Sequence, residues 1–156
     1  MKDAALSETL PGTWQLLSRI DITASGERRA EPSLGEDPIA LLIYDRHGHF
    51  AAQFMRRDRS VDMPDGPSGA RNNSRAQGGY DAYFGTYTVD EASKTLTLRI
   101  EASSFPNQVG GPEQKRTITS LTKDELKYSN AAPLTGGTID VAMRRAEQPA
   151  STGRAQ

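Results

Sequence analysis

The chain has 156 residues, with 19 basic and 20 acidic side chains and a formal net charge of −1. No basic surplus points to nucleic acid or to an acidic membrane surface. The absence of cysteine excludes disulfides and thiolate chemistry. There is no apolar run long enough to span a membrane, and residues 1–10 lack the apolar core of a signal peptide. We therefore expect one domain, located in the cytoplasm.

Short segments with alternating apolar and polar residues follow one another along the chain, separated by turn signals such as Asp45-Arg46-His47-Gly48. Eight such strands joined mostly by hairpin turns predict an all-β fold, and closure into a barrel leaves no open sheet edge. The predicted strands are Thr13–Ile22, Ile39–Tyr44, His49–Arg56, Tyr80–Val89, Thr95–Ser103, Gln114–Leu121, Glu125–Ser129 and Thr138–Arg145.

The segments outside the strands are polar or rich in glycine and proline. We expect residues 1–10 to be a flexible N-terminus, residues 11–146 the barrel and residues 147–156 a disordered tail. The long irregular segment 57–79 is expected to close the mouth of the barrel, since long loops in compact domains often carry function.

Several strings, spread in order over residues 10 to 146, resemble the lipocalin-like domain family of bacteria and fungi. They are Gly12-Thr13-Trp14, Leu42-Ile43-Tyr44-Asp45, Ala51-Ala52-Gln53-Phe54-Met55, Tyr83-Phe84-Gly85-Thr86-Tyr87-Thr88-Val89-Asp90, Phe105-Pro106-Asn107-Gln108-Val109-Gly110 and Gln114-Lys115-Arg116. The resemblance implies an eight-stranded antiparallel lipocalin-like barrel that holds a small molecule inside. The family includes binding proteins as well as cofactor-free isomerases, cyclases and lyases.

The Gly-x-Trp string resembles the first strand of a lipocalin barrel, in which the tryptophan fills the floor and an arginine from the last strand stacks on the indole. The resemblance therefore implies that Trp14 is buried at the closed end in contact with Arg144 or Arg145. The chain departs from the family in the strand Thr95–Ser103, where Leu98 and Arg99 stand in place of frequent histidines.

Two neighbouring strands carry a candidate catalytic pair, Glu101 and Arg116. In one interpretation Leu96, Leu98 and Ile100 face the interior, and Glu101 faces solvent. In the other, Glu101 faces Arg116 across a polar lumen, because Arg116 alternates with Ile118 on its own strand. There Arg116 would hold a carboxylate or phenolate and Glu101 would move a proton.

His49 is the third candidate catalytic residue, because an imidazole at the mouth of a barrel can act as a general base near neutral pH. The sequence does not decide which face of the strand His49–Arg56 points inward. Phe50, Ala52 and Phe54 are the more apolar set, and if the opposite face lines the lumen, Gln53 binds the ligand there.

Three further residues are predicted to bind substrate: Tyr44 and Tyr83 by contact with an aromatic ring system, and Asn107 from its loop. No metal-ligand spacing and no phosphate-binding glycine loop is present, so we expect no metal and no cofactor. The preferred function is a cofactor-independent isomerase, cyclase or lyase acting on a small aromatic or polyketide-like molecule. The alternatives are a carrier or sensor of small hydrophobic ligands, and an interaction protein whose apolar outer faces form a homodimer.

Overall fold

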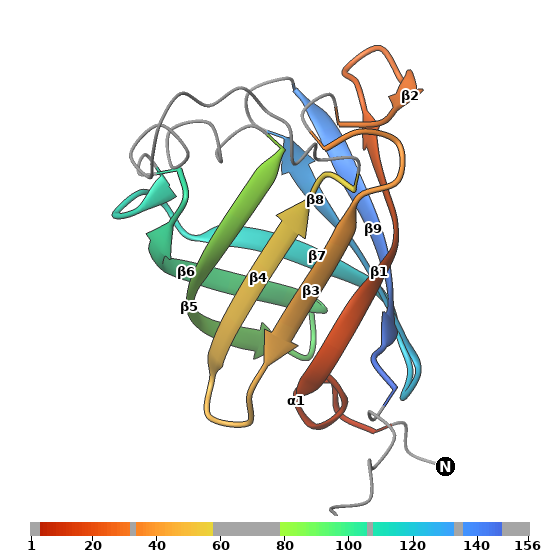
Figure 1. Cartoon of the computed structure of the whole chain (residues 1–156). Helices are drawn as coiled ribbons and strands as arrows, with labels where there is room; N and C mark the ends of the chain where they lie inside the picture. The colour runs from red at the N-terminus through yellow and green to blue at the C-terminus, as the bar shows by residue number, and fades with distance from the viewer. Residues whose placement is uncertain (1–3, 32–33, 58–78, 106–107, 133–135, 148–156) are drawn as a thin grey trace, which may run out of the picture.

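The computed structural model describes residues 4–31, 34–57, 79–105, 108–132 and 136–147. Nine strands form one antiparallel sheet, and β1 pairs with β9 to close it into a barrel of eight strands, as predicted (Figure 1). The elements are α1 Leu6–Thr9, β1 Gly12–Ile22, β2 Arg28–Arg29, β3 Ile39–Tyr44, β4 His49–Met55, β5 Tyr80–Asp90, β6 Thr95–Ser103, β7 Gln114–Leu121, β8 Glu125–Ala132 and β9 Gly137–Arg145. The predicted segment 57–79 lies, apart from its two end residues, outside the described residues.

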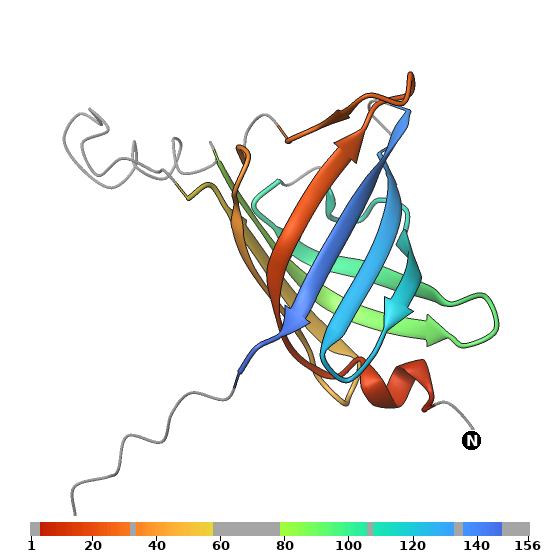
Figure 2. The ribbon, with the colours of Figure 1, turned by 90° about the vertical axis from the view of Figure 1, so that its right-hand side faces the viewer.

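The barrel wall is built mainly from neighbours in the sequence, because each of β3 to β8 pairs with the strand that follows it. The short β2 pairs only with Asp21 and Ile22 at the end of β1, and belongs to a segment that the sequence predicted as a polar loop. Figure 1 and Figure 2 show α1 beside one end of the barrel and β2 at the opposite end. We call these the α1 end and the β2 end.

Both ends carry residues from outside the eight barrel strands. Leu10 follows α1 and is fully buried, while the backbone N–H groups of Leu6 and Ser7 donate to the carboxylate of Glu91 at distances of 2.8 and 2.9 Å. The segment expected to be a flexible N-terminus thus contains a turn of helix anchored to the barrel. Between β2 and β3, Leu34 is 3% exposed and packs with the core.

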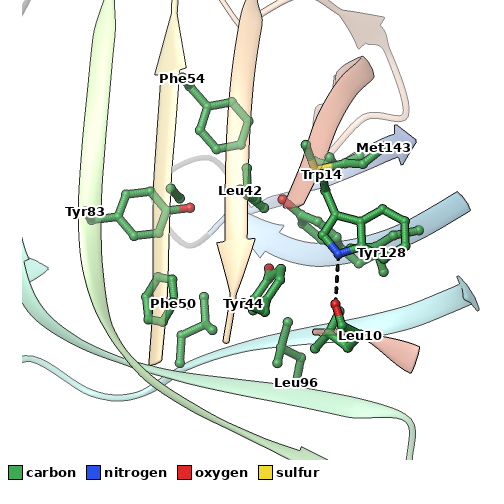
Figure 3. Packing of buried hydrophobic residues seen from close by; sticks show 14 of the residues in the cluster. Leu10, Trp14, Leu42, Tyr44, Phe50, Phe54, Tyr83, Leu96, Tyr128 and Met143 are labelled. Carbon is green, nitrogen blue, oxygen red and sulfur yellow. Dashed lines mark hydrogen bonds between the residues drawn. The ribbon is translucent and has the colours of Figure 1, made fainter. Parts of the chain in front are cut away.

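The core lies inside the barrel and is formed by apolar side chains from every strand of the wall, several of which are drawn in Figure 3. On β4 the buried residues are Phe50, Ala52 and Phe54, and on β6 they are Leu96, Leu98 and Ile100. The more apolar set therefore faces inward on both strands whose orientation the sequence left open, as expected when burial of apolar area stabilises the fold.

Candidate functional site

The α1 end of the barrel is closed by Trp14 and an arginine. Trp14 is fully buried and its indole Nε1–H donates to the carbonyl oxygen of Leu10 at 2.9 Å (Figure 3). The guanidinium carbon of Arg145 lies 4.2 Å from the centre of the indole. Arg145 also donates to the carbonyl oxygens of Pro11 and Thr9, at 2.9 and 2.6 Å. The predicted tryptophan–arginine contact is confirmed, with Arg145 as the partner.

Arg116 is the one charged residue in the buried core of the described chain, with 5% of its surface exposed. It points inward because the alternation of β7 places it on the same face as the buried Ile118. Its Nη2 donates to the Tyr83 hydroxyl at 2.5 Å, and its Nη1 lies 3.4 Å from the Tyr128 hydroxyl. The guanidinium carbon is 4.9 Å from the centre of the Tyr128 ring.

Tyrosines, rather than a carboxylate, surround this buried cation. Among the described residues no carboxylate oxygen lies within 4.0 Å of the guanidinium, and Arg116 Nε and the Tyr44 hydroxyl have no hydrogen-bond partner. Burial of a charge without a counter-charge is unfavourable, so this site is set up to gain from an added anion or acceptor. We call Arg116, Tyr44, Tyr83 and Tyr128 the tyrosine–arginine cluster.

The phenols of Tyr44 and Tyr128 keep their protons at neutral pH. Burial raises the pKa of Tyr44 well above its ordinary value, and the positive charge of Arg116 opposes that shift only in part. Burial likewise raises the pKa of Tyr128 to about 12, with Arg116 again acting in the opposite direction. Neutral hydroxyls can both donate and accept hydrogen bonds, so the cluster offers one permanent cation together with adaptable polar contacts.

A second polar group, Asp81, lies on the same inward face of β5 as Tyr83. The two residues are two positions apart along the strand, which separates their Cα atoms by about 7 Å. Asp81 pairs with the inward-facing Phe54 across β4 and β5, and its Oδ1 is buried with no hydrogen-bond partner in the described part of the chain. Burial raises the pKa of Asp81, while the nearby Arg19 and Arg116 partly offset the shift. Asp81 is therefore a buried carboxyl group next to the cluster.

Glu101 is not part of this site, and the expected lumen pair of Glu101 with Arg116 is wrong. Glu101 is exposed on the outer surface of β6. A bulge pairs Gly85 with Ile100 and Phe84 with Ala102, which leaves Glu101 without an opposite residue. Arg116 instead pairs with Leu96, five residues or about 17 Å along β6 from Glu101.

His49 and Gln53 also lie on the outer surface of the barrel. The expectations of His49 as a general base at the barrel mouth and of Gln53 as a ligand contact in the lumen are therefore wrong. Both are exposed on the outer face of β4, because the bulky Phe50 and Phe54 occupy the inner face. The His49 ring nitrogen Nδ1 lies 3.2 Å from the Asp45 carboxylate in the hairpin turn.

Of the residues predicted to contact substrate, Tyr44 and Tyr83 do face the interior and belong to the cluster. Asn107 lies outside the described residues. The predicted site residues did not include Tyr128 or Asp81. Alternation along β5 from Tyr83 was the signal available for Asp81, and alternation along β8 between the apolar Leu126 and Tyr128 was the signal for Tyr128.

Two depressions lie on the outer surface. One, of about 190 Å³, runs over the outer faces of β1, β8 and β9 and is bordered by Arg28 and Lys127. The other, of about 520 Å³, lies beside α1 and the turn between β7 and β8. Among the described residues no group of three or more His, Asp or Glu side chains could hold a metal ion. In the same part of the chain, no helix is long and apolar enough to cross a membrane.

A closed antiparallel barrel of eight strands is a scaffold suited to holding a small molecule. The sequence profile of a family described as lipocalin-like domain matches residues 11–143, and the chain belongs to this family. Similar solved structures include a redesigned β-barrel, which is 13% identical with a TM-score of 0.47, the match covering 94% of this chain and 100% of that one. Another is a bovine odorant-binding protein in complex with a selenium-containing odorant, 11% identical with a TM-score of 0.46, covering 95% and 77% of the two chains. The sequence matches none of the curated proteins.

Proposed function

We propose that the protein binds a small organic anion with an aromatic or polyketide-like body inside its barrel, and that Arg116 holds the anionic oxygen. The observation that carries the proposal is the buried guanidinium, whose Nε lacks a partner and whose neighbours are tyrosine hydroxyls rather than carboxylates. A carboxylate, phenolate or enolate would supply the missing counter-charge, and charge-assisted hydrogen bonds are the stronger kind.

The surroundings of Arg116 support an apolar body for the ligand. Tyr83 and Phe50 meet edge to face with ring centres 5.9 Å apart, and Tyr44 and Tyr87 do so at 5.2 Å. Aromatic walls bind flat ring systems through offset or edge contacts. An anion alone, such as phosphate, would leave this apolar surface unused.

The test compares two probes that differ only in charge, 2-naphthoate and 2-naphthamide, by titration calorimetry on the full chain. The wild type should bind naphthoate at least about tenfold more tightly, since a hydrogen bond to a charged group contributes about 1.5–3 kcal/mol. Arg116→Met should abolish this preference. The control is Arg144→Met, which replaces an exposed arginine on the outer face of β9 and should keep the preference. Equal affinity of both probes for the wild type would contradict the proposal. In that case, native mass spectrometry of the purified protein would identify any ligand that co-purifies with it.

Asp81 supports a second candidate function, a cofactor-independent isomerase, cyclase or lyase. In the isomerase case, the substrate is a β,γ-unsaturated ketone, and the Asp81 carboxylate takes a proton from the carbon between the carbonyl group and the double bond, with the electron pair moving onto the carbonyl oxygen. Arg116 and the Tyr83 hydroxyl stabilise the resulting dienolate, and the Asp81 carboxyl then returns the proton to the γ carbon as the double bond moves into conjugation with the carbonyl group. The substrate is neither oxidised nor reduced, so no redox partner is needed.

The two functions are separated by Asp81→Asn, with phenylpyruvate in D₂O as the probe. An enzyme should accelerate exchange of the protons on the carbon next to the ketone, seen as loss of their ¹H NMR signal, and Asp81→Asn should lower that acceleration at least about hundredfold, as loss of a general base does. Binding of the probe should persist in Asp81→Asn and weaken in Arg116→Met. Binding without any acceleration by the wild type would identify a carrier.

A further inference from the structure

Where β1, β3, β4 and β5 pair side by side, their outward residues include no Asp, Glu, Lys or Arg; the exposed Asp90 lies at the far end of β5, beyond the start of β4. Strand pairing aligns these outward residues in two rows across β1, β3, β4 and β5 (Figure 1). One row is Thr13, Ile43, Ala51 and Phe84, and the other is Gln15, Leu41, Gln53 and Ala82. Together with Leu17, Ile39, His49 and Thr86, these residues form what we call the neutral face.

Large apolar side chains are exposed throughout the neutral face. Phe84 and Leu17 are each 53% exposed, and Ile39, Leu41 and Ile43 are 38–42% exposed. The outer surface of the remaining strands differs sharply, since it carries charges on every strand. These charged residues are Arg99, Glu101, Lys115, Lys127, Asp140 and Arg144. The neutral face is thus a contiguous exposed apolar area, and the outer surface of β6 to β9 has no such area. Contiguous exposed apolar areas are typical of interaction sites.

We propose that the neutral face is the surface through which two copies of this chain associate, by stacking sheet on sheet about a two-fold axis. An apolar face without charges is complementary to itself, because pairing it with a copy buries no unpaired charge. A vesicle surface is the less suitable partner, because the face has no Lys or Arg to meet lipid headgroups.

Charges at the two borders of the neutral face fit the same arrangement. Arg144 on β9 borders the face beside β1, and Glu101 on β6 borders it beside β5. A two-fold axis parallel to the strands turns the β9 border of one copy toward the β6 border of the other. Each border also carries the other sign, Asp140 on β9 and Arg99 on β6. Arg144, opposite Gln15, and Glu101, next to Phe84, lie beside the two rows and can pair at both rims, which favours this docking.

The size of the face sets the expected strength of association. Four strands about 4.8 Å apart and rows spaced about 7 Å along them give a footprint of about 19 by 20 Å. This footprint, about 380 Å² per copy, is smaller than a standard stable interface and typical of weak, transient contacts, so we expect a dimer that forms only at tens of micromolar or above. The face lies on the barrel wall, so stacking leaves both ends of each barrel uncovered.

The test is sedimentation velocity on the full chain, from about 1 to about 100 µM. The wild type should shift from its monomer mass of 17.0 kDa to twice that value. Phe84→Glu and Ile43→Glu should each shift the midpoint at least tenfold upward in concentration, because each buries a carboxylate within the contact. Thr117→Glu, at an exposed position on the outer face of β7, should change nothing. Circular dichroism confirms that each variant is folded.

A spin label on a cysteine at Ala51 supplies a readout that does not depend on mass, since the chain has no native cysteine. Paired labels across the dimer should give a defined distance, which Phe84→Glu removes. Three outcomes would overturn the proposal: a monomer at all concentrations, a dimer insensitive to both glutamate variants, or co-sedimentation of the monomer with phosphatidylcholine vesicles that Phe84→Glu abolishes.

Discussion

Single residues inside the barrel divide the interior by polarity. Trp14 and Leu10 form an apolar floor at the α1 end, Arg116 and its tyrosines occupy the middle, and Asp81 lies beyond Tyr83 along β5. A ligand whose anionic end reaches Arg116 would therefore pass a carboxyl group that resists ionisation. Recognition and proton transfer thus depend on different residues, which single substitutions can separate.

The raised pKa of Asp81 makes a prediction about stability. A carboxyl whose pKa is higher in the folded than in the unfolded state favours folding at acidic pH, and its contribution is lost as pH rises above the ordinary aspartate range. Asp81→Asn removes this titration. The unfolding free energy of the variant minus that of the wild type should therefore increase when the pH is raised from 4 to 7. Urea denaturation at both pH values measures the difference.

The control for this experiment is Asp124→Asn, which changes an exposed turn residue and should leave the difference between the two pH values unaltered. Asp45, Asp90 and Glu91 have lowered pKa values because backbone N–H groups donate to them, so they destabilise the fold as pH falls. Their contribution is common to both proteins and cancels. If the unfolding free energies of Asp81→Asn and wild type differed by the same amount at both pH values, the assignment of a raised pKa to Asp81 would be contradicted.

Trp14 should be among the most sensitive positions in the chain. Trp14→Ala removes a fully buried indole, its hydrogen bond to Leu10 and its contact with Arg145, and should lower the unfolding free energy by about 3–5 kcal/mol. Trp14→Phe keeps an aromatic ring and should lose less. Chemical denaturation followed by circular dichroism compares the two, and native tryptophan emission close to that of the free amino acid would contradict the burial.

At the scale of elements, the alternation of residues predicted the strands well but not the local faults in their pairing. All eight barrel strands were predicted, with small differences at their ends and a β8 that continues to Ala132. Inward faces followed apolar content on β4 and β6, and this rule also places Glu101 outside. The bulge beside Glu101 depends on how β5 and β6 meet, which the alternation within either strand does not contain.

Among the site residues, Arg116, Tyr44 and Tyr83 are found inside. Arg116 was recognisable because it alternates with Ile118, whereas Tyr44 and Tyr83 were predicted as contacts to an aromatic ring system. His49 and Gln53 were also placed by function, but packing of Phe50 and Phe54 overrode that placement. The contact of Tyr83 with Arg116 joins residues 33 positions apart, so only the closed barrel brings them together.

Gly85 is the residue that allows β5 and β6 to approach at the bulge. A Cβ atom there would lie 1.9 Å from the carbonyl oxygen of Arg99, so Gly85→Ala must push the two strands apart. Gly110→Ala is the matched control, because its Cβ meets nothing within 4 Å and its only penalty comes from a φ of +74°. We expect Gly85→Ala to lose more stability than Gly110→Ala, whose loss should be about 1–2 kcal/mol. Equal melting temperatures for the two variants would contradict a tight contact at the bulge.

For the whole molecule, closure of the barrel has a consequence for how the chain folds. The contacts that seal the start of the chain against β9 join residues as far as 136 positions apart, as in the bond from Arg145 to Thr9. Bringing such distant segments together opposes closure by about 4 kcal/mol of chain entropy, so these contacts should form late and slowly. The single tryptophan lies at this seam, so a blue shift of its emission in stopped-flow refolding should report the final step. Arg145→Ala should accelerate unfolding much more than it slows refolding.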